Sequence, residues 1–137
     1  MSNNIGSYLA QFTEKAIKSG LDMAKPGKNW APMRPLVRGS HISLSVSKDK
    51  IQVNLNNDDD AERYKFRNLY AERTALAAAI GTELIWEQKE GRKKTAVRAT
   101  FEQGYENTDW GAQHDWAIKT MQSFVQEFGS RLSKIGQ

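Results

Sequence analysis

The sequence predicts an α+β domain in which helices cover an antiparallel four-stranded sheet, and two observations lead to this prediction. Apolar residues recur at helical spacing near both ends of the chain, and they alternate with polar residues in segments between the ends. Short polar turns join these segments in pairs, which implies antiparallel strands. Because 137 residues without a linker or an internal repeat suit one domain, we predict a single domain over residues 1–137 with the order α-β-β-α-β-β-α.

The first predicted element is an amphipathic helix over about residues 4–19. Its apolar side chains lie three or four positions apart, so they share one face: Ile5, Tyr8, Leu9, Phe12 and Ala16. Gly20 is a natural helix end. The following segment, residues 21–40, holds all three prolines of the chain. We expect it to form a long irregular connection with a packing or functional role.

The next segment has the two-residue period of a β-hairpin. Ile42, Leu44 and Val46 alternate with serines, and after the turn Lys48-Asp49 the apolar positions are Ile51, Val53 and Leu55. This pattern predicts one buried face and one solvent face. The solvent face consists of Ser, Gln and Asn, a hydrogen-bonding surface without charge.

A helix is predicted from Ala61 to Ile80. Asp58, Asp59 and Asp60 precede it, where a carboxylate accepts hydrogen bonds from free N–H groups and meets the positive end of the helix dipole. Its expected buried stripe ends before Gly81 and comprises Phe66, Leu69, Arg73, Leu76 and Ile80.

A second hairpin and a last helix complete the chain. The hairpin strands are predicted at Glu83–Gln88 and Thr95–Phe101, with Val97, Ala99 and Phe101 facing inward. The helix is predicted from about Trp110 to Leu132, with one packed stripe: Trp110, His114, Ala117, Met121, Phe124, Phe128 and Ile135. Trp116 falls off this stripe, so it lies either at the shoulder of the helix or exposed to a partner.

Composition excludes several classes of protein. The chain has no cysteine, so it has neither disulfides nor thiolate zinc sites. It also lacks a stretch of about 20 apolar residues and a secretory signal pattern, which favours a cytoplasmic protein that does not enter a membrane. The net charge of +4 comes from residues 1–39, which hold six Lys and Arg against two acids. This basic segment favours nucleic acid, whereas the plain alternative is a solvated basic surface.

Motifs for catalysis, metals or cofactors are weak. No Gly-x-Ser-x-Gly elbow and no glycine-rich phosphate loop occur, and we predict no catalytic residue, no metal site and no cofactor. His114 is expected to be a hydrogen-bonded residue of the core or of an interface rather than a catalytic residue. Glu87-Gln88-Lys89, with Asp58–Asp60 upstream, loosely matches a PD-(D/E)XK nuclease pattern. Charged residues are expected in a hairpin turn anyway, so we take the chain not to be an enzyme.

Two basic surfaces are candidates for binding nucleic acid or a protein partner. In the first, cations and an aromatic side chain combine phosphate contact with base stacking: Lys25, Lys28, Trp30, Arg34 and Arg38. In the second, basic residues at the turn of the second hairpin could reach a groove of a nucleic acid: Arg92, Lys93, Lys94 and Arg98. The plain alternatives are a Trp30 ring that plugs the edge of the core and a solvated turn that discourages aggregation.

Apolar and aromatic motifs along residues 5–135 resemble a bacterial, archaeal and phage domain family of unknown function. They include Asn29-Trp30, Ile80-Gly81, Leu84-x-Trp86, Asp109-Trp110 and Gln113-His114-x-Trp116. In that family the domain often follows a PD-(D/E)XK restriction-endonuclease-like domain. Here it would stand alone, because the chain starts directly in the first helix. The resemblance carries over no catalytic residues.

Three functions are open at this point. The resemblance implies a non-enzymatic module of a restriction or defence system that binds DNA, RNA or a protein. A second hypothesis is a small phage anti-defence inhibitor or adaptor that binds a host protein through an exposed aromatic patch or the Ser/Asn/Gln sheet face, with homo-oligomers also open. A metal-dependent nuclease that uses Glu87 and Lys89 is the remote third.

Overall fold

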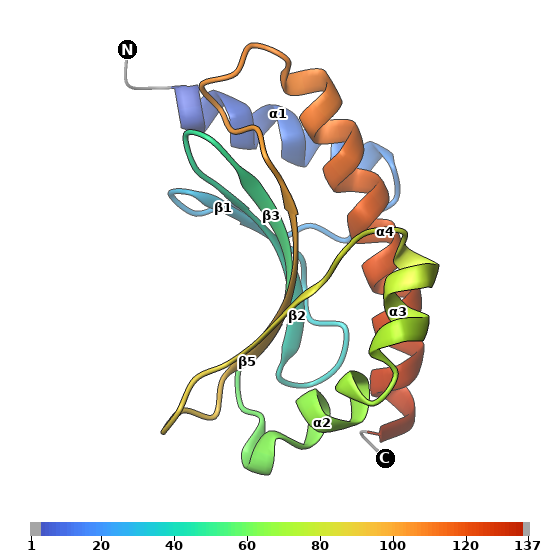
Figure 1. The fold of residues 1–137 in the computed structure, drawn as a ribbon. Coiled ribbons are helices and arrows are strands. Elements are labelled where there is room, and N and C mark those ends of the chain that lie inside the picture. The colour runs from blue at the N-terminus through green and yellow to red at the C-terminus, as the bar shows by residue number, and fades with distance from the viewer. Residues whose placement is uncertain (1–3, 136–137) are drawn as a thin grey trace.

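A computed structural model describes residues 4–135 and shows one antiparallel sheet with helices on one side (Figure 1). The predicted domain spans residues 1–137, and its ends, residues 1–3 and 136–137, lie outside the described residues. In chain order the elements are α1 (Asn4–Lys18), β1 (Trp30–Pro32), β2 (Ser40–Val46), β3 (Ile51–Asn57), the 3-10 helix η1 (Ala61–Arg63), α2 (Tyr64–Tyr70), α3 (Arg73–Ile80), β4 (Ile85–Gln88), β5 (Thr95–Phe101) and α4 (Trp110–Ile135).

The sheet has five strands in the order β1-β2-β3-β5-β4, so the predicted number of four is wrong. The additional strand, β1, lies within the segment that we expected to be irregular. It has three residues, too few for a visible two-residue period, and it includes a proline. Pro32 pairs with Ser43 at the edge of the sheet, where a residue without an N–H group is tolerated. Both predicted hairpins are present, although β4 begins at Ile85 rather than Glu83.

The single helix predicted over residues 61–80 is also wrong, because the segment is divided into η1, α2 and α3. Glu62 and Arg63 have φ angles of 58° and 56°, in the left-handed region, which separates η1 from α2. Glu72, with φ −107° and ψ 21°, separates α2 from α3. The apolar period survives these breaks, since Phe66, Leu69 and Leu76 are buried, whereas Arg73 is exposed.

The core lies between the sheet and the helices α1 and α4. Ile42, Leu44, Val53, Leu55 and Val97 point from the three central strands into it, and each has no exposed surface. Helix α4 crosses the covered face of the sheet, and α2 and α3 pack along α4 (Figure 1). Its predicted stripe is confirmed: all members from His114 to Phe128 are fully buried. Trp116 lies at the shoulder of the helix, where its ring contacts Phe101 at 5.2 Å between centroids.

The other face of the sheet carries no helix within the part of the chain that the structure describes. The sheet bulges toward the helices at its middle and its strands curve away from them at their ends, so this uncovered face lies on the inside of the curve (Figure 1). We call it the open sheet face. No helix of residues 4–135 is long and apolar enough to cross a membrane.

Candidate binding site on the open sheet face

The pairing of the strands brings polar side chains from three strands onto the open sheet face. Asn54 on β3 lies between Ser43 on β2 and Arg98 on β5, and Gln52 lies between Ser45 and Thr100. Their neighbours along the strands point to the core, because successive side chains alternate between the faces. The polar half of the two-residue pattern is therefore a continuous surface of hydroxyl and amide groups.

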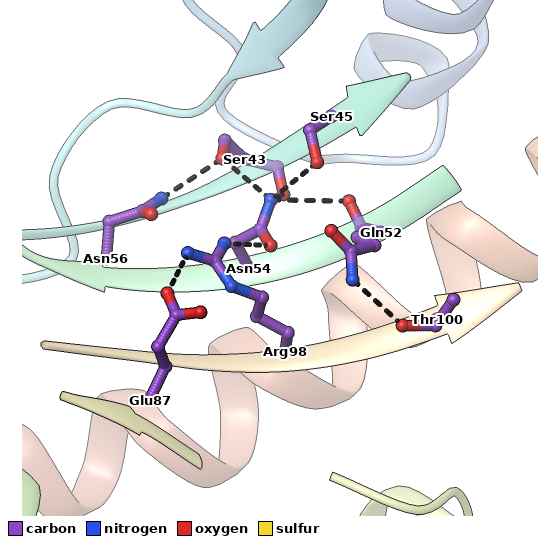
Figure 2. Close-up of polar contacts among 8 residues, drawn as sticks. All are labelled: Ser43, Ser45, Gln52, Asn54, Asn56, Glu87, Arg98 and Thr100. Atoms are coloured by element: carbon purple, nitrogen blue, oxygen red, sulfur yellow. Dashed lines mark hydrogen bonds and ion pairs between the residues drawn. The ribbon is translucent and has the colours of Figure 1, made fainter. Parts of the chain in front are cut away.

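Asn54 is the centre of a hydrogen-bond network on this surface (Figure 2). Its Nδ2 donates to Ser45 Oγ at 3.1 Å and, at 3.4 Å, to Ser43 Oγ. Its Oδ1 accepts a hydrogen bond of 2.7 Å from Arg98 Nη1. These partners leave Asn54 only 2% exposed although no helix lies above it. The network orients the amide in one direction, because reversing it would place the NH₂ group against a guanidinium.

Two further hydrogen bonds extend the network in both directions along the sheet. Asn56 Nδ2 donates to Ser43 Oγ at 3.0 Å, and Gln52 Nε2 donates to Thr100 Oγ1 at 3.0 Å (Figure 2). Each of these amides uses its NH₂ group within the sheet. Their carbonyl oxygens and the hydroxyl of Ser45 are the partly exposed polar atoms that the surface can offer to a ligand, because Ser43 is only 2% exposed.

Glu87 closes one side of the network through an ion pair. Arg98 Nη2 donates to Glu87 Oε1 at 2.6 Å, and both side chains are partly exposed (Figure 2). Glu87 belongs to the Glu87-x-Lys89 triplet weighed as a nuclease motif. The guanidinium already compensates its charge, whereas a metal-dependent nuclease uses paired carboxylates that are free to hold a cation.

A cationic pocket of about 200 Å³ adjoins this ion pair. Lys89, Arg92 and Lys94 line it from the β4–β5 turn, together with Asn56 and Asp58. Asp58 lies beside His41 Nδ1, with its Oδ2 at 3.1 Å. The structure thus brings two of the three basic turn residues predicted for binding, Arg92 and Lys94, to the end of the open sheet face, with Lys89 as an additional cation.

Trp30 lies at the opposite edge of the open sheet face, on β1. Its side chain is 38% exposed, and its ring meets the His41 ring edge to face at 5.7 Å. The indole also occupies the space where a side chain at Gly27 would begin. Trp30 is therefore held in place by its neighbours while part of it faces solvent.

The remaining predicted residues are not gathered at one site. Lys25 and Lys28 are exposed in the loop before β1, and Lys93 is exposed in the β4–β5 turn. Arg34 pairs with Asp22 at 2.8 Å. Arg38 lines a separate cavity of about 550 Å³ whose wall includes Leu132 of α4.

The amides of β3 were not among the predicted site residues, although their position on a polar face was visible. Gln52, Asn54 and Asn56 show the signal, since three amides at alternate positions of one strand are unusual for a solvated face. Their link to Arg98 depends on the register between β3 and β5, which the sequence does not reveal.

His114 is a core residue, as predicted. It has no exposed surface, and the rings of Tyr8 and Phe12 pack against it edge to face. Burial, and next the nearby Lys15 ammonium, lower the pKa of His114 from its ordinary 6.5 to about 4. Within residues 4–135 no three His, Asp or Glu side chains come close enough to hold a metal ion.

Asp60 confirms the capping role predicted for the acidic run. Its two carboxylate oxygens accept hydrogen bonds from the backbone N–H groups of Lys65 and Phe66, at 2.8 and 2.9 Å, in the first turn of α2. The hydroxyl of Thr95 on β5 also donates to it, at 2.8 Å. This carboxylate is 2% exposed, so it links the helix to the sheet inside the protein.

Replacing Asp60 with Ala is expected to lower the free energy of unfolding by about 1–3 kcal/mol. The substitution leaves two N–H groups and a hydroxyl without their acceptor in a buried place. Urea unfolding followed by circular dichroism would measure the loss. Asp59→Ala is the matched control, because Asp59 is exposed, and an equal loss in both variants would contradict the capping role.

Fold and site together define a class of protein: a small α+β domain that packs its helices on one sheet face and leaves the other face polar and uncovered. A family model described as a domain of unknown function (DUF4268) matches residues 6–132, so the chain belongs to that family. This agrees with the resemblance to a family of unknown function.

Solved structures similar to this chain include the following two. YbjN from E. coli, a candidate transcription regulator, is 12% identical over 92% of each chain, with a TM-score of 0.54. An uncharacterized protein from Methanothermobacter thermautotrophicus is 10% identical over 93% of this chain and 97% of its own, with a TM-score of 0.44. At such identities the likeness to YbjN shows a shared fold alone. Comparison with curated protein sequences finds no match.

Proposed function

We propose that the chain is a non-enzymatic binding module that holds single-stranded nucleic acid across the open sheet face. One observation carries the proposal: this face offers the partly exposed amides of Gln52 and Asn56, oriented by hydrogen bonds within the sheet, between a partly exposed indole and a cationic pocket. A face that only meets water is more commonly covered with charged residues of both signs. Amides with a fixed orientation suit a ligand that has donors and acceptors of its own.

Each part of the surface matches one part of a nucleotide strand. Trp30 can stack on an unpaired base, and Lys89, Arg92 and Lys94 can contact phosphates. The carbonyl oxygens of Asn56 and Gln52 can accept from base NH₂ groups. From β1 to β5 there are three steps between strands, or about 14 Å, a length that a few nucleotides can span. Stacking on Trp30 favours a single strand over a duplex, because duplex bases are already stacked.

Fluorescence anisotropy with labelled single-stranded DNA and RNA tests the proposal. We expect Trp30→Ala to weaken binding roughly 5- to 150-fold, since a base stacked on an aromatic ring contributes about 1–3 kcal/mol. Trp30→Phe retains a stacking ring and is expected to bind more tightly than Trp30→Ala. Absence of binding to any oligonucleotide at low salt would overturn the proposed function.

The cationic pocket gives a second, independent arm of the same test. The double variant Arg92→Glu/Lys94→Glu is expected to bind at least about tenfold more weakly and with a shallower dependence on salt, because fewer counterions are released. The double variant Lys119→Glu/Lys134→Glu is the matched control, because it changes the net charge by the same amount and both lysines are exposed on α4, away from the open sheet face. Equal weakening by the control would show that only the net charge matters.

The proposal that the module is not an enzyme is supported by the ion pair of Glu87. A cleavage assay with Mg²⁺ tests it directly. Cleavage that is abolished by Glu87→Ala would favour the nuclease hypothesis, whereas cleavage that survives the substitution would come from another source.

The biological setting that we propose, a restriction or defence system, rests on the family resemblance described above. In that setting the ligand would be DNA exposed as a single strand. A preference for RNA over DNA in the anisotropy assay would argue against this setting while leaving the binding module intact.

A further inference from the structure

A second candidate site lies on the other side of β4 from the open sheet face. The space between α2 and β4 forms a pocket of about 820 Å³, whose lining residues include Glu62, Arg63, Phe66, Arg67, Tyr70 and Trp86. This volume falls within the range of pockets that bind ligands. We call it the α2–β4 pocket.

Three aromatic rings form its apolar wall. Phe66 and Tyr70 are nearly parallel, with 5.7 Å between centroids and 8° between planes. Trp86 stands almost perpendicular to both, at 5.8 and 5.3 Å. Arg73 lies over the Tyr70 ring, 4.3 Å from its centroid. These contacts fix the orientation of Tyr70, yet 40% of it is exposed. An exposed aromatic ring that is already immobilised loses little conformational entropy when a partner covers it.

The rim of the pocket is basic. Arg63 donates through Nη2 to the backbone carbonyl of Lys89, which ties the start of α2 to the β4–β5 turn. Arg67 is exposed, and its Nε donates to the carbonyl of Glu62 at 3.2 Å. Its terminal nitrogens have no partner within residues 4–135, so they are available to a carboxylate, which a guanidinium binds with two hydrogen bonds. The rim carries two arginines and one glutamate, Glu62, so its net positive charge attracts an acidic group.

The pocket borders an edge of the sheet. Among the described residues β4 pairs with β5 alone, so its other side presents unpaired backbone N–H and C=O groups. Trp86 points to the pocket, and Ile85, on the opposite face of the same strand, is 46% exposed. β4 itself carries no lysine or proline that would discourage pairing with another chain.

We infer that the β4 edge and the α2–β4 pocket together bind an extended acidic peptide segment of a protein partner, which adds a sixth strand to the sheet. Backbone hydrogen bonds to β4 hold the segment. One apolar side chain enters the pocket beside Trp86 and Tyr70. An Asp or Glu two positions away points to the same side of the added strand and meets Arg67. The side chain between them covers Ile85.

The unpaired backbone is the observation that favours a peptide over nucleic acid at this site. A nucleotide could stack on Tyr70 and contact Arg67, but it has no amide groups spaced to pair with a strand. The site is also separate from the one proposed for nucleic acid, since Trp86 and Glu87 point to opposite sides of β4. A partner peptide and an oligonucleotide can therefore be tested independently.

Selection from a display library of short random peptides, with the whole chain immobilised, tests the inference. We expect the recovered peptides to share a large apolar residue two positions from Asp or Glu, without proline between them. Arg67→Glu and Tyr70→Ala are each expected to weaken these peptides about tenfold or more. Lys119→Glu is the matched control and is expected to leave affinity unchanged. Circular dichroism verifies that each variant is folded.

Two outcomes would overturn the inference. Peptides that lack the acidic residue, or that bind Arg67→Glu as well as the parent chain, would show that the basic rim is not used. Oligonucleotide binding that is lost in Tyr70→Ala but kept in Trp30→Ala would assign the pocket to nucleic acid. Failure of oligonucleotides to bind anywhere would overturn the proposed function and leave the peptide site unaffected.

Discussion

Gly104→Ala is expected to lower the free energy of unfolding by about 3–5 kcal/mol, the largest effect of any single methyl group that we predict. A methyl group at Gly104 would overlap the backbone of the β2–β3 turn, at the carbonyl oxygen of Ser47 and the carbonyl carbon of Lys48. Backbone atoms on both sides cannot move aside as a flexible side chain can. Either the loop after β5 or the turn must shift.

The shift would break hydrogen bonds that join three parts of the chain. The N–H groups of Tyr105 and Glu106 donate to the β2–β3 turn, at 3.0 and 3.2 Å. The carbonyl of Gly104 accepts from Gln113 Nε2 at 2.9 Å, and Gln113 in turn accepts from the hydroxyl of Tyr8 at 2.7 Å. Gln113 and Tyr8 are fully buried. Each buried polar group left without a partner costs about 1–3 kcal/mol.

Urea unfolding measures this loss, and Gly129→Ala is the control. Gly129 lies inside α4, and nothing surrounds the position of its added methyl group within 4 Å. The same substitution there is expected to stabilise the protein by about 0.5–1 kcal/mol, because Ala favours a helix and restricts the unfolded chain. Similar effects at both glycines would contradict the close approach at Gly104.

The second large effect concerns pH: we expect the protein to lose about 2 kcal/mol of stability between pH 8 and pH 5 through His114 alone. Its pKa is about 4 in the folded chain and 6.5 when the histidine is free. Between these values the unfolded state binds a proton that the folded state does not. The contribution of the neutral ring to the free energy of unfolding is therefore fully present above about pH 6.5 and is lost as the pH falls toward 4.

The surroundings of the ring explain the direction. Lys15 Nζ lies 3.0 Å from His114 Nδ1, so a lysine ammonium donates to that nitrogen and the neutral ring carries its proton on Nε2. Nε2 is buried and has no hydrogen-bond partner among residues 4–135. A second proton would place a positive charge in a buried site beside the ammonium. The carboxylate of Asp115 opposes this effect but is the smallest of the three causes.

Urea unfolding at both pH values tests this prediction. His114→Phe removes the titrating group and is expected to retain about 2 kcal/mol more of its stability at pH 5 than the parent chain does, relative to pH 8. Lys15→Ala is expected to keep most of the pH dependence, because burial is the larger cause of the lowered pKa. An unchanged pH dependence in His114→Phe would show that other groups cause the acid sensitivity.

The parts of the fold that follow from local periodicity were predictable. The helices α1 and α4 and the strands β2, β3 and β5 each repeat an apolar pattern over at least seven residues, long enough to distinguish a period of 3.6 from one of 2. The core position of His114 followed from the stripe of α4. β4, which is too short for such a repeat, followed from the hairpin turn that joins it to β5.

The errors occurred where a contact distant in sequence decided the local structure. β1 is a strand because Trp30 and Pro32 lie beside Ser45 and Ser43, not because three residues favour that conformation. The helix predicted over residues 61–80 is broken because Glu62 and Arg63 turn left-handed, which lets Asp60 reach the first turn of α2 while bonded to Thr95. No pattern within either segment contains that information.

The same distinction applies to the candidate sites. The sequence by itself determined that one face of the first hairpin is polar and uncharged and that Trp30, Arg92 and Lys94 are candidates for contact, since residue type and alternation suffice for this. Only the tertiary structure decided that Arg98 orients Asn54, that Arg38 lies apart, and that Trp86 and Tyr70 form a pocket at the β4 edge. The physical reason is that register, strand order and the packing of α2 on the sheet join residues far apart in the chain, and local composition does not encode those distances.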